Sequence, residues 1–197
     1  MLETLTGVGL ASSAGLNAYI PLLMIGVLAR YTDLINPPAG WQWLENGWVV
    51  AILAVLLLIE MVADKVPVVD HLNDLVQTVV RPTSGGLAFG AASSSETVTV
   101  TDPSAFFTTH QWVPIAVGMV ISFAVHGMKS AARPVINTTT AGMGAPVAST
   151  AEDFTAVIMS FAAILVPVLV GVLVLALIGV FAWLMSRRKR RRGLLAR

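Results

Sequence analysis

The sequence predicts an all-α integral membrane protein, and three observations lead to this fold class. Only 12% of the 197 residues are charged and 56% are hydrophobic, whereas a soluble domain carries about 25% charged residues. The apolar residues gather in long runs, and segments rich in Gly, Pro, Ser and Thr separate these runs. We therefore expect about four transmembrane helices plus two Gly/Pro-interrupted or re-entrant segments, with a membrane domain over residues 1–186 and a basic tail over residues 187–197.

Four apolar runs are the candidate membrane spans. They cover Leu5–Ala29, Trp48–Ala63, Trp112 to about Met128, and Phe154–Met185. The fourth run has 32 residues and would form a helix about 48 Å long, which exceeds the hydrocarbon core of about 30 Å. This run must tilt, project or bend, and Pro167 followed by Gly171 offers a kink site.

The segments between these runs are more polar. Residues 64–82 carry apolar side chains at helical spacing and predict an amphipathic helix, which lies at the membrane interface or lines a polar cleft. Its polar stripe consists of Asp70, Asp74, Gln77 and Arg81. We expect the interrupted or re-entrant segments at 83–92 and 136–150, and an exposed loop at 93–104.

The charge distribution predicts the orientation. Seven of the twelve basic residues lie within residues 187–197, directly after an apolar run. Such a run is typical of a cytoplasmic anchor that binds anionic lipid headgroups, so we expect a multi-pass protein of the cell (inner) membrane with a cytoplasmic C-terminus. Nucleic acid is not an expected partner, because the run abuts a span and contains no aromatic residues.

A short pattern recurs along the chain. A small-residue motif, a span, a lysine and an Arg-Pro pair follow one another twice, and a third small-residue motif begins the last span region. The motifs start at Ser12, Thr83 and Thr139, the lysines are Lys65 and Lys129, and the pairs are Arg81-Pro82 and Arg133-Pro134. Either an internal repeat or chance similarity in biased sequence explains this pattern. Small residues would allow close helix packing, and hydroxyl groups would bond across the contact.

Three segments together resemble a known family: GLASSAGLNAYIPLL, IEMVADKVPVVDHLNDLVQTVVRP, and HGMKSAARPVINTTTAGMGAPVASTAED before a long apolar helix. They are similar to a bacterial family of small multi-pass membrane proteins that is catalogued only as a domain of unknown function. The resemblance covers nearly the whole chain up to the basic tail. It implies a multi-pass membrane fold, but it does not indicate any particular activity. Gly144 stands where the resemblance implies an asparagine, which would remove a polar contact.

Acidic residues near the second span are the first candidate site. Glu60 and Asp64 are four residues apart and share a helix face. They could bind a cation or carry a proton, because ionisable groups within a membrane are by default functional. Alternatively, both acids lie among the headgroups with Lys65 as their partner. Asp70, His71 and Asp74 are weaker metal candidates, and a solvated helix face explains them as well.

Basic residues at the end of the third span form a second candidate. His126, Lys129 and Arg133 predict a cationic patch for an anion or a phospholipid headgroup, unless they snorkel to the interface. Glu152 and Asp153 could bind a cation or proton, although Ser149 and Glu152 also fit a capping box that opens the last helix.

Asn17 lies inside the first apolar run. It could line a polar pathway or form a hydrogen bond between helices. Taken together, the candidates predict a small transporter or channel-like protein for an ion, a small solute or a lipid headgroup. The alternative is a non-transporting membrane scaffold or lipid-organising protein. We find no catalytic motif and expect no cofactor, and the small number of spans makes a homodimer a reasonable expectation.

Overall fold

The computed structural model describes residues 1–93, 110 and 112–172. In this part of the chain the elements are α1 (Leu2–Leu16), α2 (Ile20–Tyr31), the 3-10 helix η1 (Ala39–Glu45), α3 (Gly47–Ala63), α4 (Pro67–Ala92), α6 (Trp112–Thr140) and α7 (Ala145–Leu165). None of the described residues lies in a strand, so the all-helical prediction is confirmed.

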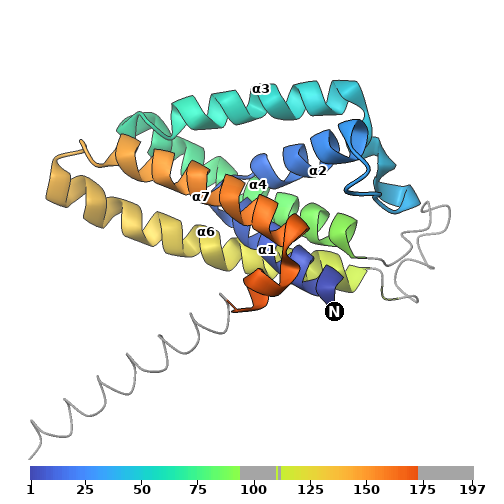
Figure 1. Cartoon of the computed structure of the whole chain (residues 1–197). Helices are drawn as coiled ribbons and strands as arrows, with labels where there is room; N and C mark the ends of the chain where they lie inside the picture. Colours follow the sequence, from blue (N-terminus) through green and yellow to red (C-terminus); the bar gives the residue numbers. More distant parts are fainter. Residues whose placement is uncertain (94–109, 111, 173–197) are drawn as a thin grey trace, which may run out of the picture.

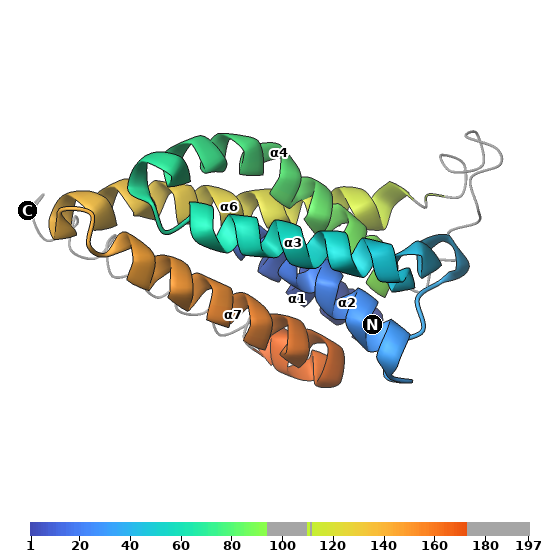
Figure 2. The same cartoon turned by 90° about the horizontal axis from the view of Figure 1, so that it is seen from above.

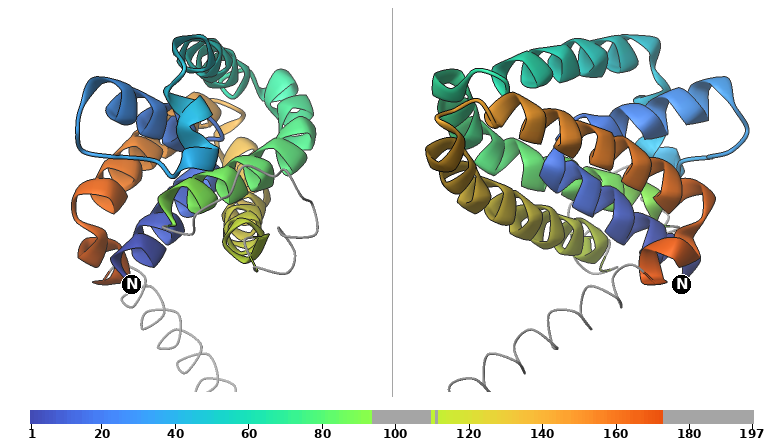
Figure 3. Two further views of the ribbon diagram at one scale, coloured as in Figure 1. Left: turned by 90° about the vertical axis from the view of Figure 1, so that its right-hand side faces the viewer. Right: turned by 60° about the vertical axis from the view of Figure 1, so that its left-hand side comes forward.

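The first apolar run turns back within the bundle. Figure 1 and Figure 3 show α1 running inward from the N-terminus and α2 returning toward the same end of the molecule. One cavity is lined both by the start of α1 and by the segment after α2, which places the two ends of this hairpin together. The prediction of one continuous span over residues 5–29 is therefore wrong. We call α1, α2 and the junction between them the re-entrant hairpin.

Asn17 causes the reversal. Its backbone is extended, with φ −143° and ψ 122°, so α1 ends at Leu16. Its side-chain oxygen then accepts hydrogen bonds from the backbone N–H groups of Tyr19 and Ile20 at 3.1 and 3.2 Å. These groups open α2 and have no intrahelical partner. The asparagine thus supplies locally the bonds that the broken backbone would otherwise lack in an apolar environment.

Of the two segments predicted to be interrupted, one lies within a continuous helix and the other contains a break. Residues 83–92 are the second half of α4, whose 26 residues continue through Pro82 and span about 39 Å; the helix is curved (Figure 2). Residues 136–150 contain the end of α6, a short turn and the start of α7. Ala141 and Gly142 adopt positive φ in that turn. The prediction of an interruption is therefore wrong for residues 83–92, whereas residues 136–150 are interrupted by the turn between α6 and α7.

Glycines that suggested irregular backbone serve close packing instead. A methyl group on Gly85 of α4 would lie 2.3 Å from Cβ of Ser122, and one on Gly118 of α6 would lie 2.4 Å from the Gly85 carbonyl oxygen. Gly15 of α1 meets the same stretch of α6, with its added Cβ 2.7 Å from the Ser122 carbonyl oxygen. Small residues therefore bring α1, α4 and α6 into backbone contact. The first two small-residue motifs share this task, whereas the third forms the turn between α6 and α7.

The outer surface of the bundle is apolar. Large side chains such as Val55 of α3, Leu75 of α4, Val120 of α6 and Phe154 of α7 are more than half exposed. Two helices, α6 and α7, are long and apolar enough to cross a membrane, and η1 with α3 forms a third candidate span bent by 63°. Apolar residues outside and polar residues inside are typical of a helix bundle in lipid.

The last apolar run is bent where the sequence predicts a kink. Helix α7 ends at Leu165, and Val166 leaves the helical conformation with φ −138° and ψ 67°. Helical backbone resumes at Pro167. Residues 173–197, including the predicted basic tail, lie outside the described residues.

Candidate functional site: a buried charge network

Charged side chains gather inside the bundle, where α3, α4, α6, α7 and the tip of the re-entrant hairpin meet. Ion pairs between 2.6 and 3.9 Å connect them. Most are at least nine-tenths buried, the exceptions being Lys65 and Glu152 with side chains 36% and 18% exposed. We call this set the charge network. Its members are Glu60, Asp64, Lys65, Arg81, Lys129, Arg133, Glu152 and Asp153.

Asp64 is the centre of the network. Its Oδ2 lies 2.7 Å from Nζ of Lys129, 3.4 Å from Nη2 of Arg81 and 3.8 Å from Nη2 of Arg133. Its Oδ1 accepts a hydrogen bond from Nδ2 of Asn73 at 2.7 Å. Asp64 follows the last residue of α3. Burial raises the pKa of this carboxyl, but Lys129, Arg81 and Asn73 together outweigh burial and hold the pKa below its ordinary value.

The acids of α7 complete the network. Oε2 of Glu152 lies 2.6 Å from Nη2 of Arg133 and 3.1 Å from Nζ of Lys129. Oδ1 of Asp153 accepts a hydrogen bond from Nδ2 of Asn17 at 2.9 Å, and its Oδ2 lies 3.9 Å from Nζ of Lys65. Each acid therefore joins α7 to a different neighbouring element.

The tip of the re-entrant hairpin is part of the site. Besides the bond from Asn17 to Asp153, the ammonium group of Lys129 donates to the carbonyl oxygen of Leu16 at 3.1 Å. That carbonyl belongs to the last turn of α1, where helical partners are missing. A movement of the hairpin tip would consequently disturb Lys129 and Asp153 together.

Arg81 connects the network to a buried histidine. Its Nη2 donates to Oε1 of Glu60 at 2.8 Å, and its Nη1 lies 3.1 Å from Nδ1 of His126. Because arginine only donates, Nδ1 of His126 must accept, so the proton of the neutral ring is on Nε2. That nitrogen donates to Oγ1 of Thr78 at 3.2 Å. His126 is thus held in one tautomer.

The structure brings together all of the candidates predicted from the sequence apart from the metal ligands. Glu60 and Asp64 are each 1% exposed, so the interpretation that they lie among headgroups is wrong. Lys129 and Arg133 turn inward to meet acids, which excludes snorkelling. The capping-box interpretation also fails, because α7 begins at Ala145 and Glu152 is bonded to Arg133 instead.

Arg81 is the residue that the sequence-based candidates omitted. It is fully buried and bonds both Glu60 and Asp64. Two signals could have found it: its place on the polar stripe of 64–82 and its recurrence as an Arg-Pro pair. The apolar stripe of that helix faces outward while Gln77 and Arg81 are buried, so the segment lines the interior of the bundle.

The weaker metal prediction gains no support. Among the described residues, no three His, Cys, Asp or Glu side chains are grouped so as to hold a metal ion. Asp74 instead accepts a hydrogen bond from Ser130 at 3.5 Å. The side chains of Asp70 and His71 lie outside the described part of the chain.

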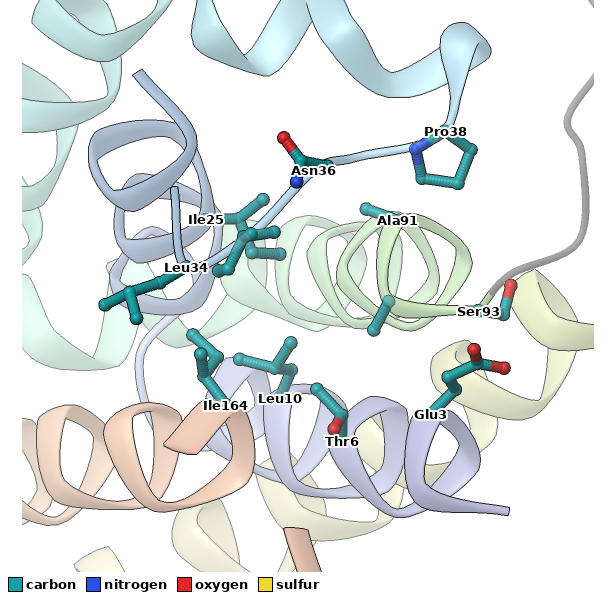
Figure 4. Close-up of a pocket in the computed structure, with 12 residues that line it drawn as sticks. Glu3, Thr6, Leu10, Ile25, Leu34, Asn36, Pro38, Ala91, Ser93 and Ile164 are labelled. Atoms are coloured by element: carbon teal, nitrogen blue, oxygen red, sulfur yellow. The ribbon is translucent and has the colours of Figure 1, made fainter. Parts of the chain in front are cut away.

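A cavity of about 540 Å³ opens at the end of the bundle that holds the N-terminus. Figure 4 shows Leu10 of α1 and Ile25 of α2 beside it, together with Ile164 of α7 and Ala91 of α4. The carboxylate of Glu3 is the charged group among its lining residues. The cavity therefore lies between the two arms of the re-entrant hairpin, whose tip touches the charge network.

Comparison with known sequences assigns the chain to a family. The chain belongs to the family described as Domain of unknown function (DUF4126). The match covers residues 4–187 and so includes the charge network, nearly all of the re-entrant hairpin, and the cavity-lining residues of this DUF4126 protein except Glu3. No curated protein and no solved structure matches the chain.

Proposed function

We propose that the protein is a small membrane transporter that moves an ion or small solute through the charge network. The single observation that carries the proposal is the burial of this network inside a bundle with an apolar surface. Ionisable groups at membrane depth are costly, and they mark substrate or ion pathways in many membrane proteins.

Stability alone is a poor explanation for the network. Removing two charges from solvent costs several kcal/mol per ion, and well-packed apolar residues of similar volume are often as stable as a buried ion pair. A network in which one charged side chain has several partners of opposite charge has another use. An incoming ion can replace one of these partners, and the side chain keeps its ion pairs with the others. Asp64, with three cations beside it, and Lys129, with two acids beside it, have this property.

The re-entrant hairpin gives the proposed route from solvent to the network. Leu10 at the cavity and Leu16 at the network are separated by six positions of α1, or about 9 Å of helix. Between them, Ser13 bonds the hydroxyl of Ser160 and the carbonyl of Ala156, both at 2.8 Å. Interrupted helices that meet at membrane depth form the sites of many transporters. In the state described here Leu10 and Ile25 close the route, since both are buried.

A membrane topology follows from this proposal. Helices α3, α4, α6 and α7 would be the four crossings, with the re-entrant hairpin entering from one side. We assign the protein to the cell (inner) membrane, with its C-terminus in the cytoplasm and the basic residues 187–197 on anionic headgroups. A homodimer stays a prediction, to be tested by the mass of the protein in detergent.

Flux measurements in proteoliposomes test the proposal. Purified protein is reconstituted in vesicles, and the fluxes of protons, alkali cations, halides and phosphate are recorded with trapped dyes and tracers. We expect flux of at least one ion above that of empty vesicles, and we expect its loss in Asp64→Asn. Flux that Asp64→Asn leaves unchanged would remove the network from the pathway. Absence of every flux would favour the scaffold or lipid-organising alternative.

A further inference from the structure

His126 contacts the charge network through one ring nitrogen and the bundle surface through the other. Its Nδ1 accepts a hydrogen bond from Nη1 of Arg81 at 3.1 Å, and its Nε2 donates one to Oγ1 of Thr78 at 3.2 Å. His126 is buried, whereas Thr78 is exposed. The imidazole ring of α6 is therefore held between a buried cation and a surface hydroxyl group, both of which belong to α4.

Two independent contacts fix the tautomer of this ring. Arginine only donates hydrogen bonds, so Nδ1 must accept from Arg81. The Thr78 hydroxyl donates its single proton to the carbonyl oxygen of Asp74 at 2.8 Å, so it must accept from Nε2. Both contacts require a neutral ring with its proton on Nε2 and a lone pair on Nδ1.

A proton on Nδ1 is incompatible with the contact to Arg81. An imidazolium ring carries N–H groups on both nitrogens and accepts no hydrogen bond, so two cationic donors would face each other. Thr78 would still accept from Nε2 and hold the ring in place, which means that the guanidinium group has to withdraw. Histidine is the side chain suited to such a change, because it ordinarily gains and loses its charge between about pH 5 and pH 8.

We propose that Nδ1 of His126 is a proton-binding site, and that a proton bound there releases the guanidinium group of Arg81 from α6. The proton comes from water and forms an N–H bond at Nδ1, while the hydrogen bond from Nη1 of Arg81 is lost. The inference rests on the proposed transport function and names the proton as an ion that controls its site.

Charged groups on three sides of the ring set the cost of the bound proton. Burial, Arg81 of α4 and Lys129 of α6 oppose the charged ring, whereas Asp74 of α4 and Asp64 after α3 favour it. Lys129 is already paired with Asp64 at 2.7 Å, while Arg81 is in direct contact with the ring. Withdrawal of Arg81 thus lowers the cost of the proton, and by linkage the proton favours the withdrawal.

The released arginine remains bonded to acids on the other side of the network. Its Nη2 lies 2.8 Å from Oε1 of Glu60 and 3.4 Å from Oδ2 of Asp64. Glu60 belongs to α3 and Asp64 follows that helix. A proton bound on α6 therefore shifts Arg81 toward the acids of α3, and its effect reaches Asp64, the centre of the charge network.

Nitrogen NMR of the histidine rings tests the site on the natural chain without any transport assay. The chain has three histidines, and His126→Asn assigns the signals of His126 by their loss. In detergent at about pH 8 we expect a protonated Nε2 and an unprotonated Nδ1, and on acidification we expect Nδ1 to gain a proton. Arg81→Met removes the neighbouring cation and should raise the midpoint by about one pH unit or more. His110→Asn is the matched control and should leave it unchanged.

Three outcomes would overturn the inference: a proton on Nδ1 at about pH 8, no proton uptake by the ring down to about pH 4, or the same midpoint in Arg81→Met. Where Arg81→Met does not fold, the tautomer and the titration of the natural chain decide.

The flux assay separates this inference from the proposed function. His126→Asn keeps a carbonyl oxygen that can accept from Arg81 but binds no proton, so its flux should lose the pH dependence of the natural protein. Proton uptake at His126 without any flux would support the proton site and contradict transport. Flux with the natural pH profile in His126→Asn would support transport and remove His126 from its control.

Discussion

The buried stripe of α6 has two halves with different chemistry. Gly118 and Ser122 in its first half contact α4 through backbone and small side chains. Lys129 and Arg133 in its second half form ion pairs with Asp64, which follows α3, and with Glu152 of α7. The spacing along the helix is the same in both halves, and only the residue type differs. The small residues of α6 therefore hold the bundle together, and its charged residues line the interior that the bundle surrounds.

The first half of the buried stripe of α6 packs tightly against the backbone of α4. The second half forms ion pairs in which one side chain has more than one partner. Gly118 cannot accept a methyl group without moving the backbone of α4. Lys129, by contrast, has acid partners on two elements and a carbonyl partner on a third. We therefore expect substitutions in the first half to affect folding and those in the second half to affect both folding and flux.

The largest expected effect is that of Lys129→Met. This change leaves Asp64 and Glu152 with fewer cations in a buried site, and breaking a buried ion pair typically costs about 3–5 kcal/mol. The free energy of unfolding in detergent measures the loss. Lys65→Met is the matched control, because the Lys65 side chain is more than one-third exposed and its ion pair should be worth less than about 1 kcal/mol. Equal losses in the two variants would contradict the role given to burial.

Gly118→Ala should have a smaller but clear effect. Its new methyl group meets the Gly85 carbonyl oxygen at 2.4 Å, and such overpacking typically costs about 1–3 kcal/mol. Gly127→Ala on the same helix is the control, since a methyl group there meets nothing within 4 Å. We expect it to gain up to about 1 kcal/mol from helix propensity. The same unfolding assay compares the two, and a stable Gly118→Ala would disprove the close contact.

A fall in pH should reduce the contribution of the ion pairs in the second half of the α6 stripe to the free energy of unfolding, and it should leave the small-residue contacts of the first half unchanged. The pKa of Asp64 is lower in the folded protein than the ordinary value of 3.8, so its ion pairs stabilise the fold above that pH. Their contribution is lost as the pH falls below 3.8 toward the folded-state pKa. The difference in unfolding free energy between the natural protein and Asp64→Asn should therefore shrink on acidification. A difference that stays constant with pH would argue against an ionised Asp64.

The smallest expected effect is at Ser122, where the two halves meet. Its hydroxyl donates to the carbonyl oxygen of Arg81 at 2.7 Å. Side-chain hydrogen bonds between membrane helices average about 0.6 kcal/mol. We expect Ser122→Ala to lose an amount of this order in the unfolding assay. A loss as large as that of Lys129→Met would mean that Ser122 also positions Arg81.

The sequence identified most charged residues of the charge network, but it did not predict that they are buried. The four-residue spacing of Glu60 and Asp64 and the cluster of Lys129 and Arg133 were visible in one dimension. Their burial was not, because an acid at the end of a span fits an interfacial position equally well. Only the fold places Arg81, 17 positions after Asp64, within 3.4 Å of it. Local patterns cannot report such pairings.

Glycine and asparagine were the least predictable residues. Gly85 suggested a broken segment, yet it lies within a continuous helix, since a missing Cβ permits either a turn or a close contact. Asn17 was recognised as unusual, but a polar residue near Pro21 fits a kinked span as well as a reversal. The reversal depends on the two hydrogen bonds that the Asn17 side chain accepts from the backbone of Tyr19 and Ile20, together with the partners of the hairpin on α6 and α7.

The central claim is that the cavity in the re-entrant hairpin leads to the charge network. The natural chain contains no cysteine, so single cysteines can report water access directly. Thr6→Cys lies at the cavity, Ser13→Cys lies deeper toward the network, and Ala163→Cys is a buried control on α7. The measurement is the rate of modification by a membrane-impermeant thiol reagent in proteoliposomes. We predict fast modification of Thr6→Cys, slower but complete modification of Ser13→Cys, and none of Ala163→Cys. A Ser13→Cys variant that conducts flux and is never modified would contradict the account.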